Sequence, residues 1–246
     1  MPRGSAPGWF ACGREPGGCT IAGMASWPSS AEELARAQLE LAAASLTLWR
    51  PRGRFTVGGC YVCFGQAEPG PGRAGDPGWA GAALGEATAV VTGPAGADYQ
   101  AGLLALREGP LLEAAVRALP ERPDVLLVNA TGRDHPRRSG LAFELGATLE
   151  LPTVGVTHRP LLAEGEWPAD ERGSTSPLLL GGEAVGYWLC TQPGSRPLAV
   201  HAGWRTGADT AVEVVLAASL GSRTPEPLRA ARTAARAARA KSPPWR

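Results

Sequence analysis

PDVLLVNATGRDHPRRSG, residues 123 to 140, joins an apolar run to a polar turn and decides how the surrounding chain is arranged. The run from Val125 to Val128 is apolar at every position, which is typical of a strand covered on both faces of a sheet. Asn129 follows the run, and the turn beyond it contains a histidine and two adjacent arginines. This polar turn directly after a buried strand is where we look for function.

Working outward, the pattern predicts a strand at 124–129, a helix from about Arg138 to Leu145 and a strand at 153–157. A strand, helix and strand in this order indicate parallel pairing through a right-handed crossover. In such sheets the functional crevice lies at the carboxyl ends of the parallel strands. The loops expected to carry chemistry follow Phe64, Asn129 and Thr157.

The flanking sequence completes a mixed α/β sheet covered by helices. Ser30 and Glu33 form a capping-box pattern, in which each side chain would bind the other residue's backbone N–H, and it predicts a helix through about Leu46. The rest of the chain predicts strands at 55–64, 79–85, 86–92, 176–181, 183–190 and 198–201, and helices at 111–119, 209–220 and 226–240. A chain of 246 residues is compatible with one such domain.

Composition narrows the class of protein. Residues 1–23 are rich in glycine and proline without periodicity, so we expect a disordered extension, with Met24 as an alternative start. The five cysteines are an odd, scattered set, which favours a reducing compartment. Cys60 and Cys63 lie three apart in a strand pattern and should face opposite sides, which favours structural roles over a metal site. Because no run of about 18 apolar residues exists, we expect a cytoplasmic protein without membrane contact.

Positive charge is concentrated at the C-terminal end. Residues 221–246 contain seven basic side chains and one acidic one, although the whole chain has a net charge of +1. The predicted last helix places four arginines on one face, and this face is either solvated or in contact with phosphates. The four residues are Arg229, Arg232, Arg236 and Arg239.

Five segments in order resemble the endonuclease V family over roughly residues 30 to 235. They are LREGP (106–110), PDVLLVNATGRDHPRRSG (123–140), LPTVGVTHRPL (151–161), GWRTGADTA (203–211) and TPEPLR (224–229). The resemblance implies a ribonuclease H-like fold over residues 24–241, followed by a short tail at 242–246. It also implies metal-dependent cleavage of DNA or RNA near deaminated purines, chiefly inosine, as in DNA repair, by a protein that is a monomer.

The resemblance further implies a set of acidic ligands for Mg²⁺, which prefers hard anionic oxygens. Glu108 and Asp209 stand at two of these positions, but Tyr61 and Asn129 stand where the family has aspartates. A phenol with a pKa of about 10 stays protonated near neutral pH, and an amide carries no charge. If the protein is active, the expected cofactor is Mg²⁺ held weakly by Glu108 and Asp209, with Asp134 and the carbonyl of Asn129 as further candidates.

The resemblance also implies contacts with nucleic acid. The HPRR turn is intact, and arginine suits phosphate because its planar fork binds two oxygens. Each of these side chains also has a purely structural reading, as a turn histidine or as a solvated charge. The candidate contact residues are Tyr99, His135, Arg137, Arg138, His158 and Arg159.

Three functions remain open on the sequence. The first is a catalytically impaired member of the family, a pseudoenzyme that still binds nucleic acid, because two metal ligands are replaced. The second is a working Mg²⁺-dependent endonuclease of DNA or RNA with an altered metal site. The third is an interaction protein that keeps only the scaffold.

Overall fold

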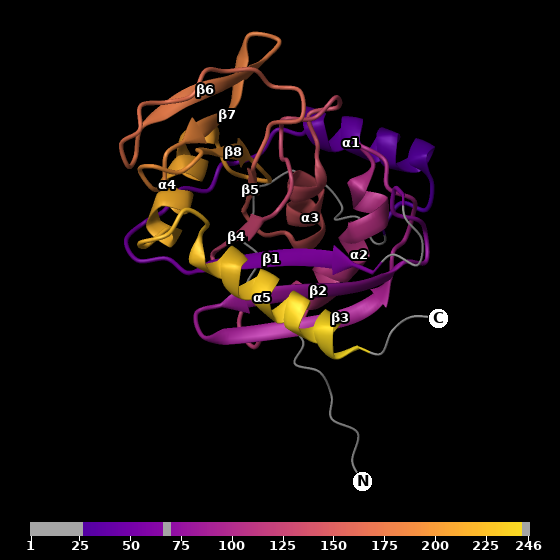
Figure 1. Ribbon diagram of the computed structural model, residues 1–246. Coiled ribbons are helices and arrows are strands. Elements are labelled where there is room, and N and C mark those ends of the chain that lie inside the picture. Colours follow the sequence, from indigo (N-terminus) through magenta and orange to yellow (C-terminus); the bar gives the residue numbers. More distant parts are fainter. Residues whose placement is uncertain (1–26, 66–69, 243–246) are drawn as a thin grey trace, which may run out of the picture.

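The computed structural model describes residues 27–65 and 70–242 and contains one eight-stranded sheet with helices on both faces (Figure 1). The strands lie in the order β3-β2-β1-β4-β5-β8-β7-β6. The expected mixed sheet of the ribonuclease H-like class is therefore confirmed. The elements are α1 (Ala31–Ala43), β1 (Val57–Phe64), β2 (Pro77–Leu84), β3 (Ala87–Pro94), α2 (Leu104–Arg117), β4 (Val125–Val128), α3 (Leu141–Leu149), β5 (Thr153–Thr157), β6 (Thr175–Leu180), β7 (Glu183–Leu189), β8 (Leu198–Ala202), α4 (Ala208–Ala218) and α5 (Glu226–Lys241).

Three strands at the centre of the sheet, β1, β4 and β5, are parallel. All four residues of β4 are fully buried, because helices cover both faces. Leu126 and Val128 pack in a cluster with α2 and α3, whereas Val125 and Leu127 pack with α4 and the start of α5. The alternation along this strand thus builds the two hydrophobic layers of the domain.

Three helix boundaries differ from the sequence expectation. Helix α2 begins at Leu104 rather than at residue 111 and includes Pro110, so Glu108 lies inside the helix and not before it. Pro110 has no N–H for the carbonyl of Leu106, yet the chain stays helical. Helix α1 ends at Ala43, and α3 begins only at Leu141 because Arg138 has a left-handed φ of 56°.

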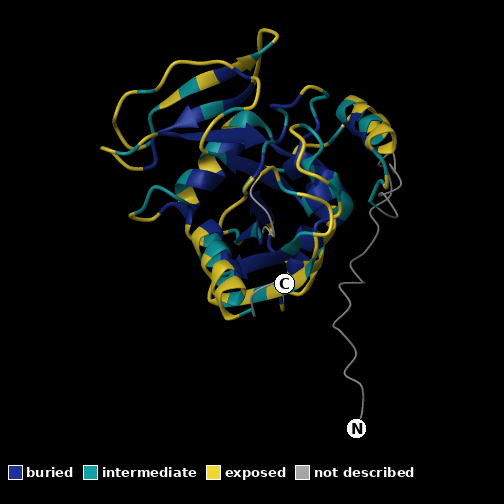
Figure 2. Cartoon of the chain, turned by 45° about the vertical axis from the view of Figure 1, so that its right-hand side comes forward, coloured by how far each residue is buried: buried dark blue, intermediate teal, exposed yellow. Residues whose placement is uncertain are grey.

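Helix α5 packs closely across β1 and β2, and two glycines make this possible. A Cβ at Gly59 would lie 2.5 Å from the carbonyl carbon of Pro227, and a Cβ at Gly81 would collide with the carbonyl oxygen of Ala231. Ala231 and Ala235 are fully buried on the inner side of α5, whereas its outer side is exposed (Figure 2). Small residues on both surfaces therefore hold this arginine-rich helix against the sheet.

Other sequence expectations have mixed outcomes. Ser30 caps α1 by accepting the N–H of Glu33, but the Glu33 carboxylate accepts from the backbone and hydroxyl of Ser29, so the reciprocal capping box is wrong. Cys60 and Cys63 are both buried, in separate clusters, as free thiols. The expected extension at 1–23, its alternative start at Met24, and Cys12 and Cys19 lie outside the described residues. Among the described helices, none is long and apolar enough to cross a membrane.

Candidate nucleic-acid cleft

A cleft of about 400 Å³ opens where β1 ends, at the edge of the sheet predicted to carry chemistry. Tyr61 and Phe64 of β1, Glu108 of α2 and Arg239 of α5 contribute to its walls. Tyr99, half-exposed on the loop before α2, also lines it. Its full set of lining residues is Tyr61, Val62, Cys63, Phe64, Gly72, Tyr99, Arg107, Glu108 and Arg239.

Tyr61 faces helix α5 from the middle of the sheet. Its ring packs in a cluster with Cys63, Trp79 and Ala235, and the guanidinium carbon of Arg236 lies 6.0 Å from the ring centroid. That distance is at the outer limit of a cation–π contact. At the position where the resemblance implies an aspartate, the chain therefore has an aromatic ring beside a cation.

Asn129 lies next to Tyr61 across the parallel pair of β1 and β4. Cys60 and Val128 are the last register partners, so Tyr61 and Asn129 each follow directly after this pair. Asn129 is exposed, directly beyond the end of β4. The two substituted positions identified in the sequence are thus neighbours in space.

Glu108 is the one acid among the residues described as lining the cleft. It lies in the second turn of α2 and is half-buried. Burial raises the pKa of its carboxyl to about 7, although the charge of Arg107 acts in the opposite direction. Burial raises the pKa of the Cys60 thiol, and the negative charge of Glu108 raises it further. A carboxyl with such a pKa is a weaker anion than an ordinary glutamate at neutral pH.

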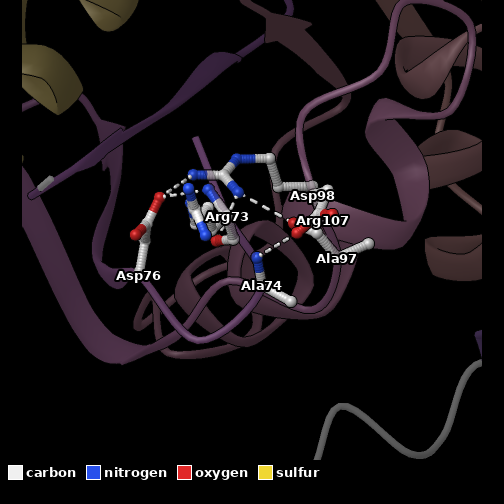
Figure 3. A network of polar contacts seen from close by, with 6 residues as sticks. All are labelled: Arg73, Ala74, Asp76, Ala97, Asp98 and Arg107. Carbon is white, nitrogen blue, oxygen red and sulfur yellow. Dashed lines mark hydrogen bonds and ion pairs between the residues drawn. The ribbon is translucent and has the colours of Figure 1, made fainter. Parts of the chain in front are cut away.

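Arg107 lines the cleft and belongs to the network of polar contacts that Figure 3 shows. Its guanidinium donates to the carboxylate of Asp76 at 2.8 Å and to the backbone carbonyls of Arg73 and Ala97, each at 2.8 Å. The hydrogen bond from Arg107 lowers the pKa of Asp76. Because Arg107 connects the loop after Gly70 to the segment at 97–99, it fixes the backbone that presents Tyr99, whose N–H donates to the carbonyl of Gly72 at 2.7 Å.

His135 and Arg137 make hydrogen bonds inside the protein. The Nδ1 atom of His135 accepts the backbone N–H of Arg137 at 3.2 Å, so Nε2 carries the proton and donates to the carbonyl of Gly102 at 3.0 Å. Arg137 donates to the same carbonyl at 3.1 Å and to Oε1 of Gln38 at 2.5 Å. Burial lowers the pKa of His135. Both side chains therefore anchor the loop that follows Tyr99, and their predicted contact with nucleic acid stays a prediction.

Arg138, His158 and Arg159 lie on neighbouring surface loops. Arg138 donates to the carbonyl of Leu180 at 2.6 Å and lies 3.6 Å from the exposed carboxylate of Glu183. His158 and Arg159 are exposed beyond the end of β5. The pKa of His158 is lowered by partial burial and by the charges of Arg223 and Arg232. All three residues therefore lie on loops that follow β4 or β5, at the carboxyl ends of these strands.

The structure does not bring the predicted metal ligands together. Asp209 begins α4, after the end of β8, and β8 runs antiparallel to β5, so this helix starts at the opposite edge of the sheet from Glu108. The Asp209 carboxylate accepts the phenol of Tyr187 at 3.0 Å. Asp134 is fully buried, and its carboxylate accepts the backbone N–H groups of residues 161–163 at 2.5 to 2.9 Å. Topology separates Glu108 from Asp209, and internal hydrogen bonds occupy Asp134, so the joint ligation expected from these three acids stays a prediction.

Within residues 27–65 and 70–242, no three acidic, histidine or cysteine side chains converge in a way that could hold a metal ion. What lies beside Glu108 instead is arginine. The sequence predicted one arginine face for the last helix but did not place Arg236 and Arg239 at the cleft. It gave no role to Arg107, whose only signal was its position in the LREGP motif.

Comparison with known proteins identifies the lineage of this cleft. A family model described as Endonuclease V matches residues 83–233. An endonuclease V of Streptomyces coelicolor is 39% identical over 219 residues, which cover 87% of this chain and 93% of that protein. The crystal structure of endonuclease V from Streptomyces avermitilis is 36% identical, with a TM-score of 0.78 over 88% of this chain and 96% of that one.

A more distant structure shares the fold. Endonuclease V of Ciona intestinalis, solved in complex with a 24mer DNA containing an inosine followed by a ribo-adenosine, is 20% identical, with a TM-score of 0.64. It matches 85% of this chain and 98% of that one. Together with the 39% identity over nearly the full length of the Streptomyces coelicolor protein, these matches show that the chain belongs to the endonuclease V family.

Proposed function

We propose that this protein binds nucleic acid, including strands that contain inosine, and cleaves it weakly or not at all. Family membership supports the binding, since the Ciona intestinalis member is in complex with inosine-containing DNA. The single observation that carries the second half is that Tyr61 of β1 and Asn129, directly beyond β4, occupy the two positions where the resemblance implies aspartates, with Glu108 as the one acid among the described residues that line the cleft.

The donor set explains the expected loss of rate. Mg²⁺ binds carboxylates and other hard oxygens in an octahedral shell, and catalysis requires it to neutralise charge on the phosphate. Here Glu108 would hold such an ion almost alone, because the other polar side chains that line the cleft are the phenols of Tyr61 and Tyr99, the Cys63 thiol and the guanidinium groups of Arg107 and Arg239. These residues do not fit a catalytic magnesium ion, so no cleavage step is assigned to one.

The test is a nicking and binding assay on single-stranded and duplex oligonucleotides, each with or without one inosine. We expect binding to both kinds of strand and little nicking with Mg²⁺ or Mn²⁺. Efficient nicking that Glu108→Ala abolishes would overturn the impaired-enzyme proposal and favour the altered metal site. Absence of binding at low salt would overturn the nucleic-acid proposal. A protein partner retained by the double variant Arg137→Ala and Arg138→Ala would then favour the scaffold function.

A further inference from the structure

The arginines of α5 suggest what replaces the metal in the cleft. Arg239 lines the cleft wall together with Glu108 and Tyr61, and Arg236 lies over the ring of Tyr61. Both arginines are exposed and act on the nearby Cys63, whose thiol has a pKa that burial raises and these two cations lower. Positive charge therefore reaches into the same volume that the family resemblance assigns to a cation.

These two arginines differ from Arg229 of the same helix in their partners. Arg229 forms an ion pair with Glu226 one turn away. For the described part of the chain, no ion pair joins Arg236 or Arg239 to an acid. Guanidinium groups without a carboxylate partner favour phosphate, which their planar forks bind through two hydrogen bonds.

The docking of α5 holds the two arginines in place. Gly59 and Gly81 let the helix backbone approach the sheet, and Ala235 packs against Cys63, Trp79 and Tyr61. At the C-terminal end of the helix, the indole N–H of Trp79 donates to the hydroxyl of Ser242 at 3.0 Å. Because contacts on both sides of Arg239 fix the backbone at residues 235–242, that backbone is held at the wall of the cleft that Arg239 lines.

We propose that Arg236 and Arg239 bind a backbone phosphate of the nucleic acid directly in this cleft, in place of a metal-bridged contact. The inference rests on the proposed nucleic-acid function and adds its chemistry: the contact is independent of divalent ions. A cleft of about 400 Å³ is large enough for a phosphate with part of its nucleoside. Tyr99 at its rim offers a half-exposed ring for a neighbouring base.

The experiment compares wild-type protein with the double variant Arg236→Gln and Arg239→Gln, using a fluorescent single-stranded oligonucleotide in EDTA and in Mg²⁺. We expect wild-type affinity to be the same in both buffers, or lower in Mg²⁺. The double variant should bind at least about tenfold more weakly. In a plot of the logarithm of the binding constant against the logarithm of the salt concentration, the slope should become shallower by about 0.7 for each phosphate that the protein no longer neutralises. Arg229→Gln, on the same helix but paired with Glu226, is the matched control and should bind like wild type.

Two results would overturn the inference while leaving the proposed function intact. The first is binding that EDTA abolishes and Mg²⁺ restores, and the second is wild-type affinity in the double variant. If the wild-type protein binds no oligonucleotide at all, the proposed function fails. A titration with inorganic phosphate, followed by NMR, then tests separately whether the two arginines bind phosphate. Shifts of the Arg236 and Arg239 side-chain NMR resonances would support the phosphate site, and unchanged resonances would overturn it. Unfolding curves of each variant confirm that the fold is intact.

Discussion

Arg236 of α5 lies over the ring of Tyr61, with 6.0 Å between the guanidinium carbon and the ring centroid. Tyr61 stands where the family has an aspartate, and Arg236 lies where the negative charge of that aspartate would attract it. An aspartate at position 61 would meet Arg236 before it met a metal ion. Restoring a metal site at this position therefore requires substitution of both Tyr61 and Arg236.

The first prediction concerns this pair. The double variant Tyr61→Asp and Asn129→Asp should gain Mg²⁺-dependent cleavage of an inosine-containing strand, because two carboxylates would join Glu108. At a saturating concentration of strand, adding Arg236→Gln should raise the rate further, since it removes the competing ion pair, although the strand itself then binds more weakly. We expect a total gain of at least about a hundredfold, equivalent to about 2.7 kcal/mol of transition-state stabilisation. Gel assays of strand cleavage measure it.

Two controls make that result interpretable. When Glu108→Ala is added to the double variant Tyr61→Asp and Asn129→Asp, the new activity should be lost, because Glu108 is the one acid among the described residues that line the cleft. Arg229→Gln in place of Arg236→Gln should give no further gain. If the double variant, with or without Arg236→Gln, binds the strand but remains inactive with Mg²⁺ and Mn²⁺, the absence of the two carboxylates does not explain the impairment.

The second prediction concerns the ion pair of Arg107 with Asp76, which are 4% and 10% exposed. Asp76→Asn should lower the free energy of unfolding by at least about 2 kcal/mol, because it leaves a buried guanidinium without its anion. Glu226→Gln, which breaks the exposed pair with Arg229, should cost less than about 1 kcal/mol. Urea unfolding measures both, and equal decreases would show that the buried network does not organise the loop.

Much of the fold could be predicted because local patterns and tertiary packing agree. The apolar β4, the strand β5 and the hairpin of β6 and β7 all lie within one or two residues of their expected bounds. In that hairpin, Gly181 and Gly182 both have positive φ values, of 61° and 81°, which suit a tight two-residue turn. Where turn glycines, apolar runs and chain direction all indicate the same structure, the bounds of strands and turns can be predicted from the sequence.

The site was harder to predict because its residues depend on long-range topology. The sequence predicted a helix that begins at residue 111, yet α2 begins at Leu104 and Glu108 lies inside it. The family resemblance implied that Asp209 is a ligand, but only the antiparallel pairing of β8 with β5 shows that it lies at the other edge. The arginine face of α5 was visible, whereas its contact with the cleft depends on glycines in two distant strands.

The third prediction concerns pH. Glu144 is fully buried, and burial raises its pKa to about 8, while the hydrogen bond from Gln38 of α1 at 2.6 Å and the charge of Arg137 act in the opposite direction. The unfolded carboxyl ionises near 4.5, so the folded state alone keeps the proton between that value and about 8. Stability should therefore fall as pH rises through this window, by up to about 1.4 kcal/mol per pH unit.

Glu144→Gln tests this linkage, because it keeps the oxygen that accepts from Gln38 and cannot ionise. Near pH 5 the variant and the wild type should unfold at similar urea concentrations, and above pH 8 the variant should be the more stable. Other titrating groups, including the buried His201, are common to both proteins and cancel in the difference. Parallel pH profiles would contradict the prediction.

The last prediction concerns the seat of α5 on the sheet. A methyl group added by Gly59→Ala would lie 2.5 Å from the carbonyl carbon of Pro227 and 2.7 Å from the backbone nitrogen of Leu228, closer than the 3.0 Å that real Cβ atoms respect. Since these are backbone atoms, the helix itself must move. We expect a decrease of about 1 to 3 kcal/mol in the free energy of unfolding.

Because α5 carries Arg236 and Arg239, the same change should weaken oligonucleotide binding and expose the helix to limited proteolysis. Gly207→Ala is the control, since its new methyl group would meet only Leu48, at 3.8 Å, and its backbone has an ordinary φ of −93°. That variant should match the wild type in stability and in affinity. If Gly59→Ala also matches it in both, the close approach of α5 to β1 does not position the two arginines, and their place in the cleft would need another cause.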